Sequence, residues 1–112
     1  MRYALMICAP PDHADALTDA EREAVVRDYS ALTGDPRNVA HAQLQPVDTA
    51  TSVRVVDGKL LVTDGPFADT KEVLGGFALI EAANLDEVIE LAAGIPAARM
   101  GGVVEIRPIV EH

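Results

Sequence analysis

The sequence contains a single cysteine, Cys8, and no tryptophan. A lone cysteine cannot form an intramolecular disulfide, and chains without disulfides are typical of reducing compartments, so we predict a cytoplasmic location. Apolar residues flank Cys8 on both sides, which favours a buried, inert thiol over a catalytic nucleophile. The apolar stretch at residues 3–9 runs into Pro10 and Pro11 without a clear cleavage site, so it predicts a first strand rather than a secretion signal.

Basic residues are also scarce. Nine Lys and Arg residues oppose 18 Asp and Glu residues, which gives a formal net charge of −9. Nucleic acids and anionic membrane surfaces are both held by basic faces, so this balance argues against either as a partner. No apolar run approaches the roughly 20 residues that a membrane-spanning helix needs. We therefore expect no nucleic-acid partner and no membrane partner.

What the sequence does contain is enough apolar material for one core. Hydrophobic residues make up 49% of the 112 positions. A chain of this size buries roughly two thirds of its unfolded surface, which is sufficient for a core without metals or disulfides. The sequence shows no repeat, low-complexity tract or interdomain linker, so we predict a single domain over residues 1–112.

Two segments carry the signals of helices. Thr18 can cap a helix that ends near Gly34, and Glu21, three residues later, completes a capping box. This helix has one apolar stripe, formed by Val25, Tyr29 and Leu32. A second helix is expected between Asn84, which can cap its start, and Gly94, which follows its end.

Four segments are predicted to be strands of one sheet: residues 2–8, 38–44, 73–82 and 103–110. The first and third are almost continuously apolar, as expected of inner strands covered on both faces. Gly75 and Gly76 interrupt the third strand, which indicates a β-bulge or the close approach of another backbone.

Residues 53–62 predict a β-hairpin. Asp57-Gly58 suits a two-residue type I′ turn, because both central positions of that turn require a positive φ. The turn sets the register, with Val53 opposite Val62 and Val55 opposite Leu60. Since side chains alternate along a strand, these four aliphatic residues share one face.

This order of elements predicts an α+β fold, a ferredoxin-like βαββαβ sandwich with an added β-hairpin. Both helices of such a sandwich cover the same face of the sheet. The other face would be an exposed apolar patch larger than monomers normally tolerate. Because most homo-oligomers are twofold symmetric, a homodimer that packs sheet against sheet is the simplest cover.

Residues 63–77, TDGPFADTKEVLGGF, closely resemble the DGPF branch of the YCII-related family of small bacterial proteins. Further matches are the segments at residues 44–46, 50–54, 95–99 and 104–108. The resemblance spans nearly the whole chain. It implies a dimeric α/β barrel, in which two ferredoxin-like sheets pack face to face.

The resemblance implies little about activity, because the family's biochemical role is largely unassigned. Related YCII proteins carry a His and an Asp proposed as an active-site pair. The Asp corresponds here to Asp64, whereas His41 lies where the DGPF branch usually has glycines, and Asp69 replaces a more usual Glu. Some DGPF-type proteins are encoded near, or fused to, extracytoplasmic-function (ECF) sigma factors.

Asp64 is the main candidate for catalysis. Extending the hairpin register places Thr51 opposite Asp64, on the same face as the four aliphatic residues. A carboxylate at the rim of an apolar face is partly desolvated, which raises its pKa toward the range of a general acid or base, and the Thr51 hydroxyl would orient it. Asp-Gly-Pro is also a sequence typical of turns, in which the Asp side chain accepts hydrogen bonds from backbone amides. Both interpretations remain open.

Four further residues are candidates, and three of them also have a structural interpretation. His41 could serve as a base near neutral pH or be a solvated or packing residue. Arg54 could hold an anionic substrate or pair with surface carboxylates. Phe67 could line a pocket or the dimer interface, and Lys71 is a candidate substrate-binding cation.

Cofactors and metals are not expected. The three histidines, His13, His41 and His112, have no ligand-like spacing. Neither glycine pair precedes a helix as a phosphate-binding loop requires.

We therefore expect a homodimer that binds a small molecule. If it is also an enzyme, we expect it to work without a cofactor and to use Asp64 as acid or base. The alternative is a non-catalytic regulatory or scaffold module associated with an ECF sigma factor. A pocket in which Asp64 and a second titratable group meet would favour the enzyme.

Overall fold

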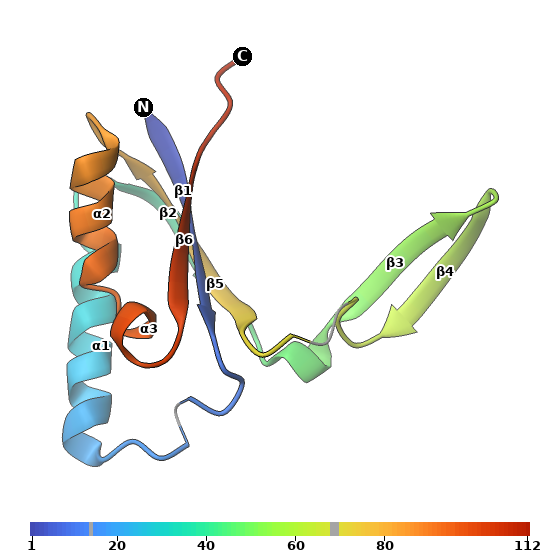
Figure 1. Ribbon diagram of the computed structural model, residues 1–112, viewed down its shortest axis with the longest axis horizontal. Coiled ribbons are helices and arrows are strands. Elements are labelled where there is room, and N and C mark those ends of the chain that lie inside the picture. Colours follow the sequence, from blue (N-terminus) through green and yellow to red (C-terminus); the bar gives the residue numbers. More distant parts are fainter. Residues whose placement is uncertain (14, 68–69) are drawn as a thin grey trace.

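The structure is a computed structural model that describes residues 1–13, 15–67 and 70–112 (Figure 1). Its elements are, in order, β1 (Arg2–Ala9), α1 (Asp19–Thr33), β2 (Asn38–Gln43), the 3-10 turn η1 (Val47–Thr49), β3 (Thr51–Val56), β4 (Lys59–Asp64), β5 (Val73–Glu81), α2 (Leu85–Ala93), α3 (Pro96–Arg99) and β6 (Val103–Pro108). The predicted strands and both predicted helices are present. The short elements η1 and α3 were not predicted.

Four strands form an antiparallel sheet in the order β2-β5-β1-β6. All three α-helices lie on one side of this sheet (Figure 1). The α+β class is therefore confirmed, and the order of elements and strands fits the ferredoxin-like sandwich.

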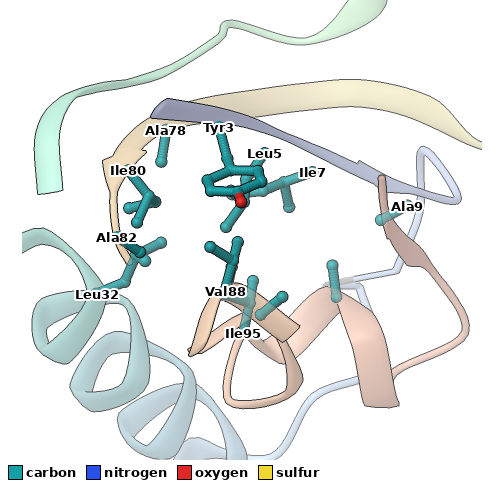
Figure 2. Packing of buried hydrophobic residues seen from close by; sticks show 12 residues of the cluster. Tyr3, Leu5, Ile7, Ala9, Leu32, Ala78, Ile80, Ala82, Val88 and Ile95 are labelled. Carbon is teal, nitrogen blue, oxygen red and sulfur yellow. The ribbon is translucent and has the colours of Figure 1, made fainter. Parts of the chain in front are cut away.

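The core lies between this sheet and the helices. Alternate residues of β1 are buried on the helix-facing side, and Ala78 and Ile80 of β5 join them. Leu32 of α1, Val88 of α2 and Ile95 just before α3 close the cluster from the other side (Figure 2). Among the described residues no polar or charged residue is buried, so the core is held by apolar packing.

The caps of both helices form as expected from the sequence. The Glu21 amide donates to Thr18 Oγ1 at 3.1 Å, and the Thr18 amide donates to Glu21 Oε1 at 3.0 Å. The Glu87 amide donates to Asn84 Oδ1 at 3.0 Å. Each bond satisfies an amide that has no partner within its helix.

Gly75 and Gly76 fulfil both predicted roles. Between β1 and β5, Ile7 pairs with Gly76 and Cys8 pairs with Leu74, so Gly75 is the extra residue of a β-bulge. A Cβ at Gly76 would lie only 2.9 Å from the carbonyl oxygen of Ala42 on β2. Glycine is required at that position because β2 and β5 approach so closely.

The hairpin β3–β4, residues 51–64 and here called the arm, is a separate two-stranded sheet. Asp57 and Gly58 have φ values of 51° and 74°, as the type I′ turn demands. Every predicted pair is confirmed, from Val56–Lys59 at the turn to Thr51–Asp64 at the base. The arm projects away from the body on the side of the sheet opposite the helices (Figure 1).

That side of the sheet, here called the open face, has no cover from any described element of the same chain (Figure 1). Its strand pairs place apolar residues over the middle, namely Ala4, Met6, Cys8, Leu74, Phe77, Leu79 and Val103. Ion pairs between Arg2 and Glu81 and between Arg107 and Glu105 lie toward the strand ends and the β6 edge. The apolar open face expected from the sequence is thus present in the single chain.

Candidate functional site

Thr51 and Asp64 form the last pair at the base of the arm, on its aliphatic face. Both are exposed. The turn that follows Asp64 is held by Gly65, whose amide donates to the Ala50 carbonyl at 2.7 Å and whose carbonyl accepts from Ser52 Oγ at 2.7 Å. No hydrogen bond to the Asp64 carboxylate occurs among the described residues, so the turn is closed without it.

His41 lies elsewhere. It pairs with the buried Ala78, which places it on the helix-facing side of the edge strand β2. Its Nδ1 is 3.2 Å from Asn38 Oδ1, and the Asn38 side chain donates to the Leu32 carbonyl at 3.0 Å. His41 therefore belongs to the four-stranded sheet, whereas Asp64 belongs to the arm, and no hydrogen bond joins these two described residues.

The remaining candidates are dispersed. Arg54 pairs with Leu61, so it lies on the opposite face of the arm from Asp64, and it makes no ion pair within the described part of the chain. Phe67 follows the arm and is 80% exposed. Lys71 is exposed just before β5. Of the six predicted residues, Thr51 and Asp64 are the two that face each other as a strand pair in the described part of the chain.

A cavity of about 500 Å³, half open to solvent, lies at the end of the four-stranded sheet from which the arm departs. Three segments far apart in the sequence form it: the chain after β1, the stretch from the end of β2 into η1, and the start of β5. The lining residues are Ala9, Pro10, Pro11, His13, Gln43, Leu44, Gln45, Pro46, Val47, Asp48, Val73, Leu74 and Gly75. None of the six predicted site residues is among them.

Prolines shape two of the three segments. Pro10 and Pro11 have no amide hydrogen to continue the ladder of β1, so the chain turns away there. Pro46 fixes its own φ at −51° and leads into η1, which carries Asp48. The sequence shows these prolines, but it does not show that they line one cavity. That depends on where strand ends that are distant in the sequence lie in the fold.

The polar groups of the cavity include a histidine and a carboxylate. His13 Nδ1 lies 3.1 Å from the Pro10 carbonyl oxygen. Because a carbonyl oxygen accepts, Nδ1 carries a proton in this contact, and Nε2 is left to face the ligand as an acceptor in the neutral ring or a donor in the protonated ring. Asp48, also a lining residue, supplies an acceptor. Neither residue was predicted as part of a site from the sequence, in which His13 has no ligand-like spacing and no pattern marks Asp48.

A smaller cavity of about 290 Å³ lies between α2, α3 and β6. None of the described residues that line it has a titratable side chain. They are aliphatic residues and one glycine: Ile89, Ala92, Ala93, Ala98, Gly102, Val103, Val104 and Ile106. It offers no polar group that could orient a ligand through its side chain.

Cys8 has the character of an inert thiol. It is half-buried on the open face, and burial raises the pKa of its thiol, an effect to which the nearby charges of Glu105 and Glu72 add. A raised pKa keeps the thiol protonated, and the protonated form is a poor nucleophile.

The described residues contain neither a cluster of metal ligands nor a helix that could span a membrane. In residues 1–13, 15–67 and 70–112, no three His, Cys, Asp or Glu side chains gather as metal ligands would. Within those same ranges, no helix has both the length and the apolar character needed to cross a bilayer.

Comparison with known proteins identifies the family. The YCII-related domain matches residues 1–112. The chain belongs to the YCII-related family. It is also 36% identical over 114 residues to "Uncharacterized protein R00369" of Rhizobium meliloti (strain 1021), with 97% of this chain and 92% of that protein covered. The resemblance noted in the sequence is confirmed at the level of the family, and membership of the DGPF branch stays a prediction.

Proposed function

We propose that this YCII-family protein binds a small organic molecule in the cavity formed by the ends of β1, β2 and β5. The observation that carries the proposal is the cavity itself. Its volume of about 500 Å³ falls within the range of roughly 300–1,000 Å³ typical of ligand sites. Such sites are mostly apolar with a few convergent polar groups, and this lining has that composition.

The lining also indicates the kind of ligand. Pro10, Val47 and Leu74 offer apolar contact, the Asp48 carboxylate is a hydrogen-bond acceptor, and a neutral His13 ring would add a second acceptor at Nε2. The protein carries a formal charge of −9, and none of the described residues that line the cavity is a Lys or Arg. These features favour a neutral or cationic molecule with an apolar body and a hydroxyl or amino group.

Binding is better supported than catalysis. A general acid or base at Asp64 needs a second polar group and a substrate beside it. Within one chain, Asp64 has neither a described hydrogen-bond partner nor a place in the cavity lining. A catalytic Asp64, with Arg54 as an anion anchor, would therefore depend on groups brought by a second chain.

The proposed active form is a cytoplasmic homodimer. The uncovered apolar open face supports the dimer, because monomers rarely leave such a surface in water. The single cysteine supports a reducing compartment.

A thermal-shift screen of small hydroxyl- and amine-bearing metabolites tests the binding site. Compounds that stabilise the wild type should lose their effect in Val47→Trp, because the indole fills the cavity. The matched control is Val26→Trp on the exposed side of α1, which should respond like the wild type.

The same screen separates the other readings. Asp64→Asn should still be stabilised by the compounds that stabilise the wild type. If Asp64→Asn loses this stabilisation while Val47→Trp keeps it, the binding site lies at the arm and not in the cavity. A wild type that no compound stabilises would contradict the binding proposal and favour a scaffold that works with a sigma factor.

A further inference from the structure

The single chain exposes more surface than a compact protein of its mass. Its accessible surface is 7,814 Å² at 11.9 kDa, whereas the size relation for folded monomers gives about 6,000 Å². Its radius of gyration is 15.9 Å, against about 13 Å for a compact domain of this length. About 1,900 Å² of each chain is thus surplus surface, and the exposed residues of the projecting arm and the open face contribute to it.

The arm has the properties of a segment that needs a cover. Four aliphatic side chains on one face are each 59–69% exposed: Val53, Val55, Leu60 and Val62. A hairpin of two strands is at best marginally stable alone in water. Its outer edges also have no described strand beside them, and open edges favour pairing with another chain.

The arm and the open face are arranged to receive the same partner. The arm projects on the side of the sheet that the helices leave uncovered (Figure 1). A molecule placed against the open face therefore also lies beside the arm. Since a twofold axis gives both molecules identical contacts, a second copy would satisfy the arm and the open face of each chain at once.

We propose that the arm is exchanged in the homodimer, so that the aliphatic face of each arm packs against the body of the second copy. Burial of the surplus in both chains would remove about 3,700 Å² in total, which lies within the 2,000–5,000 Å² of obligate homodimers. This inference rests on the dimer of the proposed function and names the surface that holds it together. It does not depend on the ligand.

Two aspartate variants test the exchange. Val55→Asp places a charge on the aliphatic face of the arm, where Val55 is 69% exposed in the single chain. The matched control is Val26→Asp on α1, where the valine is 65% exposed. Light scattering after size exclusion gives the mass of each variant, and circular dichroism checks that the helices are retained.

The only cysteine supplies a second readout. Cys8 lies on the open face, so its reaction rate with a thiol dye reports whether that face is covered. The wild type and Val26→Asp should be dimers in which Cys8 reacts slowly with the dye. Val55→Asp should be a folded monomer in which Cys8 reacts at least about tenfold faster.

The outcomes separate the two ideas. A Val55→Asp dimer with a protected Cys8 would overturn arm exchange and leave the dimer intact. A monomeric wild type would overturn both. Val55→Thr retains the branched side chain that strands favour, so it keeps the test decisive if the aspartate variant does not fold. It should raise the dimer dissociation constant about tenfold, and an unchanged constant would contradict the exchange.

Discussion

At the level of single residues, Asp35 and Arg37 form a bidentate ion pair. Arg37 Nε and Nη2 donate to the two carboxylate oxygens of Asp35 at 3.0 and 2.9 Å, and the Arg37 amide donates to Oδ1 at 2.9 Å. Arg37 Nη1 also lies 3.8 Å from Glu87 of α2. The pair therefore connects the end of α1, the start of β2 and α2.

This geometry predicts an acid-sensitive contribution to stability. The hydrogen bonds from the Arg37 side chain and amide lower the pKa of Asp35 from 3.8 to about 2. Because the folded-state pKa is the lower one, the contribution is complete above about pH 5 and is lost as the pH falls from about 4 to 2. Solvent screening limits it to about 1 kcal/mol.

Asp35→Asn should therefore be less stable than the wild type at pH 7, with the difference in unfolding free energy vanishing near pH 2. Urea titrations at several pH values measure it. Arg37→Gln and the double variant complete a cycle in which the second substitution should add little. A difference that does not change with pH would contradict the assignment.

At the level of elements, the sequence was sufficient to predict those features that neighbouring residues determine. The turn at Asp57-Gly58 fixes the arm register, and Thr18 with Glu21 fixes the start of α1. The face on which His41 lies could not be predicted, because the register of β2 shifts between Asn38 and Ala40. One extra residue in a strand reverses which side chains face the helices.

The candidate site was harder to predict than the elements. Its cavity is formed by residues near positions 9–13, 43–48 and 73–75, and their proximity follows only from the strand order β2-β5-β1. The prolines and His13 can be recognised in the sequence, but their proximity in the fold could not be predicted from it. The short helix α3 had one local signal, Pro96 at its first turn, which is a favoured position for proline.

The two strand glycines give a prediction for the packing of β5 against β2. Gly76→Ala should lower the unfolding free energy by about 1–3 kcal/mol, because its methyl group would meet the Ala42 carbonyl oxygen at 2.9 Å. Gly75→Ala is the matched control. Its nearest non-neighbouring atom would be the Ile7 carbonyl oxygen at 3.9 Å, an ordinary contact. Urea unfolding measures both, and equal losses would show that close approach is not the reason for Gly76.

At the level of the whole molecule, the sheet and helices form a core that one chain completes, whereas no described residue of that chain covers the open face or the aliphatic face of the arm. The core cluster joins β1 and β5 to α1, α2 and the residues around α3. The same strands carry apolar residues on their other side, where no described element of the single chain packs against them. The stability of the fold should therefore be divided between intramolecular packing and association.

That division makes the melting temperature depend on protein concentration. If unfolding also separates two chains, each tenfold rise in concentration adds about 1.4 kcal/mol to the stability of the dimer. With the average unfolding entropy of globular proteins, two chains of this length give a rise of about 3 °C per tenfold increase. Calorimetry over a hundredfold range of concentration measures it. Val55→Asp, with its arm contact broken, should melt at one temperature throughout, and a wild type that does the same would show that its chains unfold alone.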